Sequence, residues 1–341
     1  MKHLDSRTVG YSAVRYRLLL VLVGVLIVGG FTVSDFLTID TFQSVLDRAT
    51  VVGFLALGLT PVLIAGQIDL SIGSILSMSC ITTIYLQPII GNIPAAIAGL
   101  AVGVLIGILN AAIVVVFKIN SLVATLATLL IFASLALLLT DSYPLSSKDP
   151  LFGIGLTANL LGIFTPRSAL FLVAVIIMFV WLRTTPSGRN LYAVGSNAPA
   201  ATSAGINTNA YLVTTFVISG FCSGAAGVLQ SLSTATGSPV AGAVMLIPAI
   251  TAVVIGGTRL EGGRGSSLAT LGGVLALGAL TTMLEFNGVP SYTQAIYTGL
   301  LLILLITLDS LVGRDGATTS RSPRRVRVAP TTPSNSIGGE A

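Results

Sequence analysis

The residues best suited to chemistry in this chain lie in the stretch Gly66-Gln67-Ile68-Asp69-Leu70-Ser71-Ile72-Gly73-Ser74, between two long apolar runs. The stretch places the carboxylate of Asp69 where water is scarce. An ionisable group in or at the edge of a membrane is costly, so by default it indicates a functional site. Gly66 and Gly73 flank the carboxylate, and glycine lets the backbone leave helical geometry without a Cβ clash. The stretch therefore predicts a helix, a short break and a new helix.

Three roles are open for Asp69. As the N-cap of the following helix, its carboxylate would accept hydrogen bonds from backbone amides that lipid cannot satisfy. It could instead contact a solute directly, or take part in gating. The simplest placement is at a helix break near the cytoplasmic end of the second apolar run, which favours capping first.

The chain lacks the residues of a catalytic or nucleotide-binding site. A phosphate-binding P-loop needs a lysine at Gly-x4-Gly-Lys-[Ser/Thr] spacing, and the nearest lookalike, Gly257–Ser266, has none. The lone histidine, His3, is in the N-terminal tail, while Cys80 and Cys222 lie inside apolar runs. No nucleophile, metal-ligand cluster or disulfide is indicated. We therefore expect no enzyme and no metal, and any energy must come from another polypeptide or an ion gradient.

The composition is that of a protein lying mostly in lipid. Hydrophobic residues make up 53% of the 341 residues and charged residues 9%, against about 45–50% and about 25% in soluble domains. Ten apolar runs are recognisable: 18–33, 49–65, 72–90, 95–117, 122–139, 168–182, 210–229, 248–257, 266–284 and 292–308. The run 248–257 has about half of the roughly 20 residues that a span needs. The sequence predicts an all-α polytopic membrane protein of about ten transmembrane helices, some short or broken.

The positive charges predict the orientation. With the N-terminus inside, 14 of the 17 lysines and arginines fall on the cytoplasmic side, and only Arg48, Lys148 and Arg167 fall outside. This predicts a cytoplasmic N-terminal tail (1–17), a membrane domain (18–309) with a cytoplasmic loop at 183–209, and a disordered basic cytoplasmic tail (310–341). The net charge of +5 therefore reflects topology, not nucleic-acid affinity.

The loop at 183–209 predicts a short cytoplasmic helix. Asn197 or Ser196 would cap a helix over residues 199–204, with Gly205 just after its end. A proline near the start and a glycine after the end fit the usual asymmetry of helices. Two readings remain open, an ordinary capped connector and a rigid element that transmits movement from a partner protein.

A faint internal echo links two parts of the chain. Val62–Gly66 before Asp69 resembles Val253–Gly257 before Glu261. Glycine-interrupted apolar segments in corresponding positions of two halves are typical of inverted-repeat transporters. Aligning the two segments needs one gap, so chance similarity of glycine-rich apolar sequence is an equally open explanation.

Several segments together resemble one family, the integral membrane permeases of ribose-, arabinose- and xylose-type sugar ABC importers. Gly66–Ser74 looks like that family's Gly-Gly-Ile-Asp-Leu-Ser-Val-Gly-Ser. The other matching segments are 107–110 with 119–128, 188–197 with 200–206, and 252–258 with 262–266. They follow in order from residue 58 to about 309, so the resemblance covers most of the chain.

The chain departs from the family pattern at a few positions. Gln67 replaces a usual glycine and Asn120 a usual proline, which affects local bends. Leu246 stands where the family commonly has glutamate, which bears on how a binding protein docks. Thr202 and Ser203 replace a basic and an apolar residue, which bears on the identity of the ATPase partner.

The resemblance implies a non-catalytic permease subunit of the cell (inner) membrane. Its implied partners are ABC ATPase subunits, an extracytoplasmic sugar-binding protein, a second permease copy or paralogue, and membrane lipid. ATP and magnesium would bind in the ATPase, so no cofactor is expected in this chain. The solute would be a pentose, hexose or related polyol, selected mostly by the binding protein. The alternative is a secondary transporter of a small polar solute driven by an ion gradient.

Two sets of site residues are predicted, the first from the resemblance and the second from residue types and positions. The ATPase-coupling loop comprises Gly188, Arg189, Tyr192, Gly195, Asn197, Ala200, Ala201 and Gly205. The candidates for the translocation pathway or gating are Asp69, Ser71, Asn110 and Thr125. Asn110 and Thr125 could hydrogen-bond a sugar hydroxyl, but asparagine and threonine in membranes also bond neighbouring helices.

Overall fold

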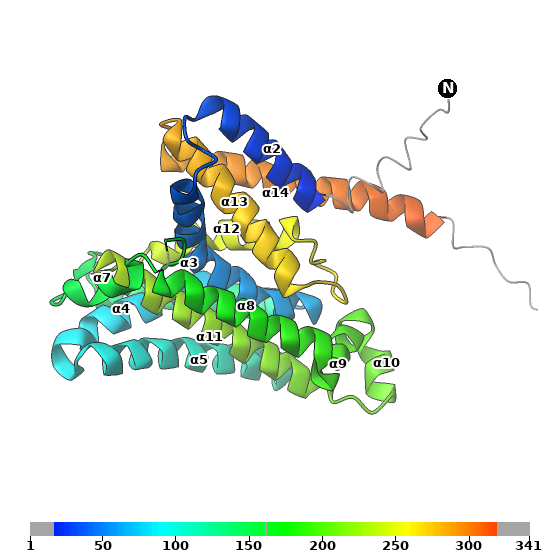
Figure 1. The fold of residues 1–341 in the computed structure, drawn as a ribbon. Coiled ribbons are helices and arrows are strands. Elements are labelled where there is room, and N and C mark those ends of the chain that lie inside the picture. Colours follow the sequence, from blue (N-terminus) through cyan, green and yellow to red (C-terminus); the bar gives the residue numbers. More distant parts are fainter. Residues whose placement is uncertain (1–16, 161, 319–341) are drawn as a thin grey trace, which may run out of the picture.

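The computed structural model describes residues 17–160 and 162–318, which are almost entirely helical (Figure 1). In chain order the elements are α2 (Arg17–Thr32), α3 (Ile39–Ile64), α4 (Ile72–Ile90), α5 (Asn92–Val115), α6 (Ser121–Leu139), β1 (Leu145–Ser146), α7 (Leu151–Thr157), α8 (Pro166–Thr184), α9 (Pro186–Ser196), α10 (Ala198–Ser203), α11 (Thr208–Thr234), β2 (Thr236–Gly237), α12 (Ala241–Ile255), α13 (Ser267–Phe286) and α14 (Ser291–Thr318).

Each of the ten predicted apolar runs lies in a separate helix. Seven helices of the described chain, α3, α4, α5, α6, α8, α11 and α13, are long and apolar enough to cross a membrane. Three shorter apolar helices cover residues 18–32, 241–255 and 291–307. The all-α, multi-pass architecture is therefore confirmed. Helix α14 continues to Thr318, so residues 310–318 of the predicted disordered tail are helical. The remaining tail residues, 1–16 and 319–341, lie outside the described residues.

Two helices begin seven or more residues before their apolar runs. Helix α3 starts ten residues before Ala49, and this extension includes two charged residues that pair with neighbouring helices: Asp47 with Arg167 on α8, and Arg48 with Glu285 on α13. Helix α12 starts at Ala241, seven residues before Pro248, which lies inside the helix. The run 248–257 is thus the second half of a 15-residue helix.

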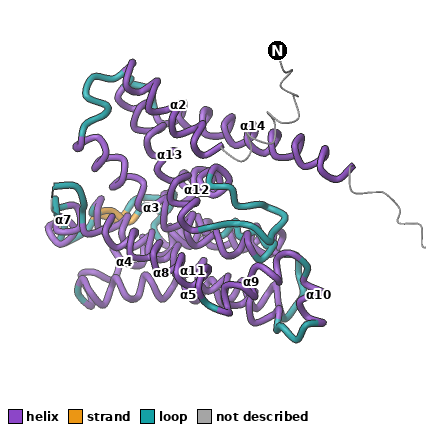
Figure 2. Tube along the Cα trace, turned by 45° about the vertical axis from the view of Figure 1, so that its right-hand side comes forward, coloured by secondary structure: helices purple, strands orange, loops and turns teal. Residues whose placement is uncertain are grey.

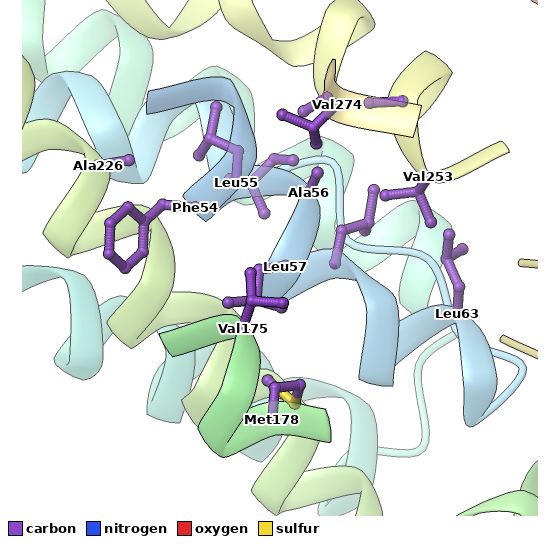
Figure 3. Close-up of a cluster of buried hydrophobic side chains, with 14 of the residues drawn as sticks. Phe54, Leu55, Ala56, Leu57, Leu63, Val175, Met178, Ala226, Val253 and Val274 are labelled. Atoms are coloured by element: carbon purple, nitrogen blue, oxygen red, sulfur yellow. The ribbon is translucent and has the colours of Figure 1, made fainter. Parts of the chain in front are cut away.

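Helix α3 lies at the centre of the core. It packs against α11, α13, α12 and α8, and Figure 3 shows its side chains Phe54, Leu55 and Leu57 among residues of those neighbours. The rings of Phe54 and Phe171 lie 5.5 Å apart between centroids. Because α3 is enclosed on several sides, a shift of either of its ends must be passed on to its neighbours.

Helices α5 and α11 approach through glycine. A Cβ added to Gly103 would lie 2.6 Å from the carbonyl oxygen of Gly220, and one added to Gly220 would lie 2.4 Å from that of Gly103. Small residues allow this close backbone contact in membrane proteins. The pair forms a rigid wall beside α4, which packs against both helices.

The ends of α3 and α12 share one hydrogen-bond geometry. In residues 62–67 and 253–258, the amide of the sixth residue donates to the carbonyl of the first (3.0 and 3.3 Å). The amide of the fifth residue donates to the carbonyl of the second (2.9 and 3.0 Å). In both segments the fifth residue is a glycine in the left-handed region, Gly66 with φ 73° and Gly257 with φ 93°. Both segments of the internal echo thus end in a Schellman-type helix end. The same geometry also occurs at residues 201–206 and 284–289, so it does not distinguish the echo from chance similarity.

The loops gather at two opposite ends of the helix bundle. Strands β1 and β2 pair antiparallel, with Leu145 opposite Gly237, and lie beside α7 (Figure 2). Helices α9 and α10 lie at the other end (Figure 1). The two loops that carry the polar motifs, α3–α4 and α12–α13, reach toward the α9 end, where their backbones meet.

Candidate functional site

The carboxylate of Asp69 is fully buried in the loop between α3 and α4. Its Oδ1 accepts hydrogen bonds from the amide of Ser71 (2.9 Å) and from the hydroxyl of Ser71 (2.6 Å). Its Oδ2 accepts a hydrogen bond from the hydroxyl of Ser219 on α11 (2.7 Å). Within the described chain no lysine or arginine forms a salt bridge with Asp69. Three hydrogen-bond donors, rather than a cation, therefore compensate the buried carboxylate.

The side chain of Asn110 extends this cluster to α5. Its Nδ2 donates to the hydroxyl oxygen of Ser71 (2.7 Å), so that α4, α5 and α11 are joined through one loop. Ser219 follows Thr208, the first residue of α11, by eleven residues, which is about 16 Å along a helix. The carboxylate is thus set well inside the bundle.

Thr125 and Ser121 hold the same loop from the side of α6. The hydroxyl oxygen of Thr125 accepts from the amide of Leu70 (3.1 Å), and that of Ser121 accepts from the amide of Ile68 (3.2 Å). The hydroxyl of Thr125 in turn donates to the carbonyl of Ser121 (2.8 Å). Buried amides without an intrahelical acceptor need such partners. The first turn of α6 therefore fixes the break between α3 and α4.

The break is confirmed, whereas the capping position is wrong. Helix α4 begins at Ile72 with Ser71 as its N-cap residue, and the Ser71 side chain makes no capping bond. Asp69 lies two residues before that cap and accepts from the amide of the cap residue itself. The carboxylate does accept a hydrogen bond from a backbone amide, but that amide precedes the helix. Asp69 therefore fixes the turn that leads into α4 and does not cap the first turn of α4.

The loop predicted to be cytoplasmic contains two helices, α9 and α10, of which only α10 and its caps were predicted. Asn197, not Ser196, caps α10, and its side-chain oxygen accepts from the amide of Ala200 (3.0 Å). Gly205 follows the C-cap with φ 81°. Upstream, the hydroxyl oxygen of Thr185 caps α9 by accepting from the amide of Gly188 (3.0 Å). The predicted helix over 199–204 thus corresponds to α10.

Helix α9 is seated directly on the backbone of its neighbours. A Cβ on Gly188 would lie 2.3 Å from the carbonyl oxygen of Trp181 on α8, and a Cβ on Gly195 would lie 1.7 Å from that of Ile64 at the end of α3. Leu191 and Val194 are buried between these contacts. At both glycines the backbone of α9 contacts the backbone of its neighbour with no side chain in between. Helix α9 and the start of the α3–α4 loop therefore form one rigid contact.

The α12–α13 loop completes this junction. The amide of Gly263 donates to the same Ile64 carbonyl (2.9 Å), and the hydroxyl of Tyr192 on α9 donates to the carbonyl of Gly265 (2.8 Å). Burial raises the pKa of Tyr192, although the positive charge of Arg183 acts in the opposite direction. The hydroxyl therefore stays protonated and can donate. Helix α9 therefore touches both the end of α3 and the α12–α13 loop.

A family model described as "branched-chain amino acid transport system / permease component" matches residues 41–305. The chain belongs to this family of permease components. With its apolar helices, the permease is a multi-pass membrane protein. No solved structure matches it.

The permease has relatives of similar length. It is 33% identical over 290 residues to the ribose import permease protein of Haemophilus influenzae, covering 82% of this chain and 88% of the relative. It is 33% identical over 271 residues to the ribose import permease protein of Bacillus subtilis (78% and 83%). It is also 33% identical over 283 residues to the autoinducer 2 import system permease protein of Escherichia coli SMS-3-5 (81% and 82%). The family resemblance inferred from the motifs is thereby confirmed.

The eight predicted coupling residues lie together on α9, α10 and the turn after α10, but they differ in exposure. Arg189 and Ala200 are exposed on the permease, and Arg189 also donates to the carbonyl of Thr184 (3.3 Å). Ala201 is buried, with 4% of its surface exposed. The segment thus has an inner face fixed to the bundle and an outer face open for a partner.

The four predicted pathway residues, Asp69, Ser71, Asn110 and Thr125, are brought together around one loop and are all fully buried. Sequence reasoning missed Ser219 and Ser121, which complete their hydrogen bonds. Ser121 follows Asn120, the N-cap of α6, so a polar helix start was available as a signal. Ser219 stands beside Gly220 in a run of small residues and gave no signal of its partner, 150 positions away.

Proposed function

We propose that this permease is the membrane-spanning subunit of an ATP-driven, binding-protein-dependent importer in the cell membrane, and that its solute is a pentose, hexose or related polyol. The relatives support the solute class, since they are named as importers of ribose and of autoinducer 2. The family description mentions branched-chain amino acids, but the relatives that match about four fifths of the chain are named as ribose and autoinducer 2 import permeases. The chain itself forms part of the translocation pathway for the solute and is not an enzyme.

The observation that carries the proposal is the seating of Gly195 against the carbonyl of Ile64. An ATPase that binds the exposed face of α9 and α10 would move α3 and its following loop without a flexible link. ATP and magnesium bind in that partner, and this chain supplies only the contact. The ATPase would move the coupling residues on α9 and α10, and these residues would in turn move the α3–α4 loop.

The buried cluster around Asp69 acts in gating by fixing the α3–α4 loop. Asp69, Ser71, Asn110 and Thr125 are bonded to one another or to the loop backbone. Among their side-chain oxygens and nitrogens only the Oδ1 of Asn110 is buried without a partner, which leaves little for a solute to bind. The solute path would then form between this chain and a second copy or a paralogue, and an extracytoplasmic sugar-binding protein would deliver the solute.

The proposed function is tested directly by measuring which energy source drives uptake. The permease, reconstituted in proteoliposomes with its ATPase and binding protein, should take up radiolabelled ribose or a related sugar only when ATP reaches the ATPase. An ATPase variant that lacks its P-loop lysine is the matched control and should reduce uptake to background. A protonophore or sodium ionophore should leave uptake unchanged. Uptake that persists without the ATPase and stops when the ion gradient is dissipated would instead establish a secondary transporter.

We also propose ten crossings with both termini, α9 and α10 in the cytoplasm and with β1 and β2 outside. The charge distribution supports this orientation, and two of the three outer positive residues, Arg48 and Arg167, are paired with acids.

The orientation predicts which single cysteines can be labelled from outside. The native Cys80 and Cys222 are buried, so the maleimide should react only with an added, exposed cysteine. On intact cells a membrane-impermeant maleimide should label Lys148→Cys, which is near β1, and not Ser203→Cys on α10. Inside-out vesicles should give the reverse. Labelling of Ser203→Cys from outside would refute the proposed orientation.

A further inference from the structure

A pocket of about 530 Å³ lies between the end of α8, α9 and the loop that leads into α13. Three arginines line it: Arg183 from α8, Arg189 from α9 and Arg264 from the loop. No acidic residue is among the lining residues, and in the described chain none of these arginines forms a salt bridge. The pocket therefore concentrates positive charge for which the described part of the chain supplies no salt-bridge partner.

One wall of the pocket consists of hydrogen-bond donors at the start of α13. Ser267, the first residue of the helix, lines the pocket with 1% of its surface exposed, and its hydroxyl has no hydrogen-bond partner. Ser266, the N-cap residue, makes no side-chain capping bond. The first intrahelical amide to find an acceptor is that of Thr270, which donates to Ser266 (2.9 Å). The amides before it point out of the helix end, where an anion is favoured.

Another part of the pocket lining is apolar. Phe179 and Leu182 of α8 line the pocket next to Tyr192. The hydroxyl of Tyr192 is already engaged with the carbonyl of Gly265, so it presents its ring rather than a free donor. The pocket thus combines guanidinium, hydroxyl and helix-end donors with an apolar side that continues along a membrane-crossing helix.

We infer that this pocket binds a phosphate group, carried either by an anionic lipid headgroup or by a free phosphate anion. Guanidinium groups bind phosphate oxygens in bidentate fashion, and the free hydroxyl and helix-end amides supply further donors. Basic pockets between helices at the cytoplasmic side suit lipid phosphates. A bound phosphate would link α8, α9 and the α12–α13 loop, and so would stiffen the element that contacts α3. The inference is independent of the solute that is transported.

Binding is measured on the purified, delipidated full-length chain. Native mass spectrometry should show one saturable phosphatidylglycerol per chain and far weaker binding of phosphatidylcholine with the same acyl chains. Arg264→Gln should weaken phosphatidylglycerol binding about tenfold, because a charge-assisted contact is lost. Ser267→Ala should weaken it a few-fold without loss of folding, since its hydroxyl has no partner to lose. Arg259→Gln is the matched control: it removes an exposed arginine from the same loop but outside the pocket.

A second titration separates the two sources of phosphate. If millimolar inorganic phosphate raises the Tm of the wild type but not of Arg264→Gln, and displaces phosphatidylglycerol, the pocket accepts a free phosphate. If inorganic phosphate does neither while phosphatidylglycerol binds, the site is for lipid. Absence of saturable binding by both probes overturns the inference, as does equal weakening by Arg259→Gln and Arg264→Gln. Should Arg264→Gln fail to fold, Arg183→Gln at the exposed end of α8 takes its place.

Discussion

Gly195→Ala is expected to abolish ATP-coupled uptake although the chain still inserts into the membrane. The added Cβ would lie 1.7 Å from the carbonyl oxygen of Ile64 and 2.8 Å from the amide nitrogen of Gly263. Both are backbone atoms and cannot rotate away, so α9 must move off α3 or the two loops must separate. Overpacking of this kind costs about 1–3 kcal/mol or more. Uptake of labelled sugar and ATPase activity of the assembled complex are the measurements. Membrane insertion is checked by resistance to alkaline carbonate extraction, and assembly by size-exclusion chromatography.

A matched control comes from Gly24, which lies inside α2 with no heavy atom within 4 Å of its added Cβ. Gly24→Ala also places alanine in a helix and should leave uptake unchanged. Alanine is favoured over glycine in helices by about 1 kcal/mol, so loss of function in Gly195→Ala cannot come from helix propensity. ATPase activity that continues while uptake is lost would indicate uncoupling at α9. Wild-type uptake by Gly195→Ala would refute α9 as the transmitting contact.

Local features of the chain were predictable because they depend on neighbouring residues. The break at Gly66–Ser71 and the Asn197 cap of α10 follow from glycine and side-chain capping chemistry within a few positions. The early starts of α3 and α12 were not predictable from the sequence, because these segments contact residues that are distant in the sequence. The carboxylate of Asp47 inside α3 accepts hydrogen bonds from Thr165 and Arg167, which lie 118 and 120 positions later.

The candidate site was predictable as a set of residues but not as an arrangement. Asp69, Ser71 and Asn110 were singled out from their types and from the family resemblance, and they prove to be hydrogen-bonded together. Apolar periodicity shows which segments are helices but not which helices are neighbours. The contacts of Ser219 with Asp69 and of Gly195 with Ile64 arise from tertiary packing, so no local pattern could reveal them.

Asp69→Ala is expected to destabilise the assembled permease by about 2–4 kcal/mol, because buried donors that lose their acceptor each cost about 1–3 kcal/mol. The hydroxyls of Ser71 and Ser219 can rotate toward other acceptors, but the amide of Ser71 cannot. The Tm in detergent should fall and uptake should be lost with it. Asp40→Ala, at an exposed site in the first turn of α3, is the control and should cost at most about 1 kcal/mol.

Asp69→Asn separates the hydrogen bonds of this carboxylate from its charge. The amide has the same shape, and its oxygen can still accept from the amide and hydroxyl of Ser71. Its nitrogen would donate to the hydroxyl of Ser219, which can accept as well as donate. Because the loop keeps all three contacts, Asp69→Asn should stay within about 1 kcal/mol of the wild type and should still transport. A variant with wild-type Tm but no uptake would show that the negative charge itself is needed, and that fixing the α3–α4 loop is only part of what Asp69 does.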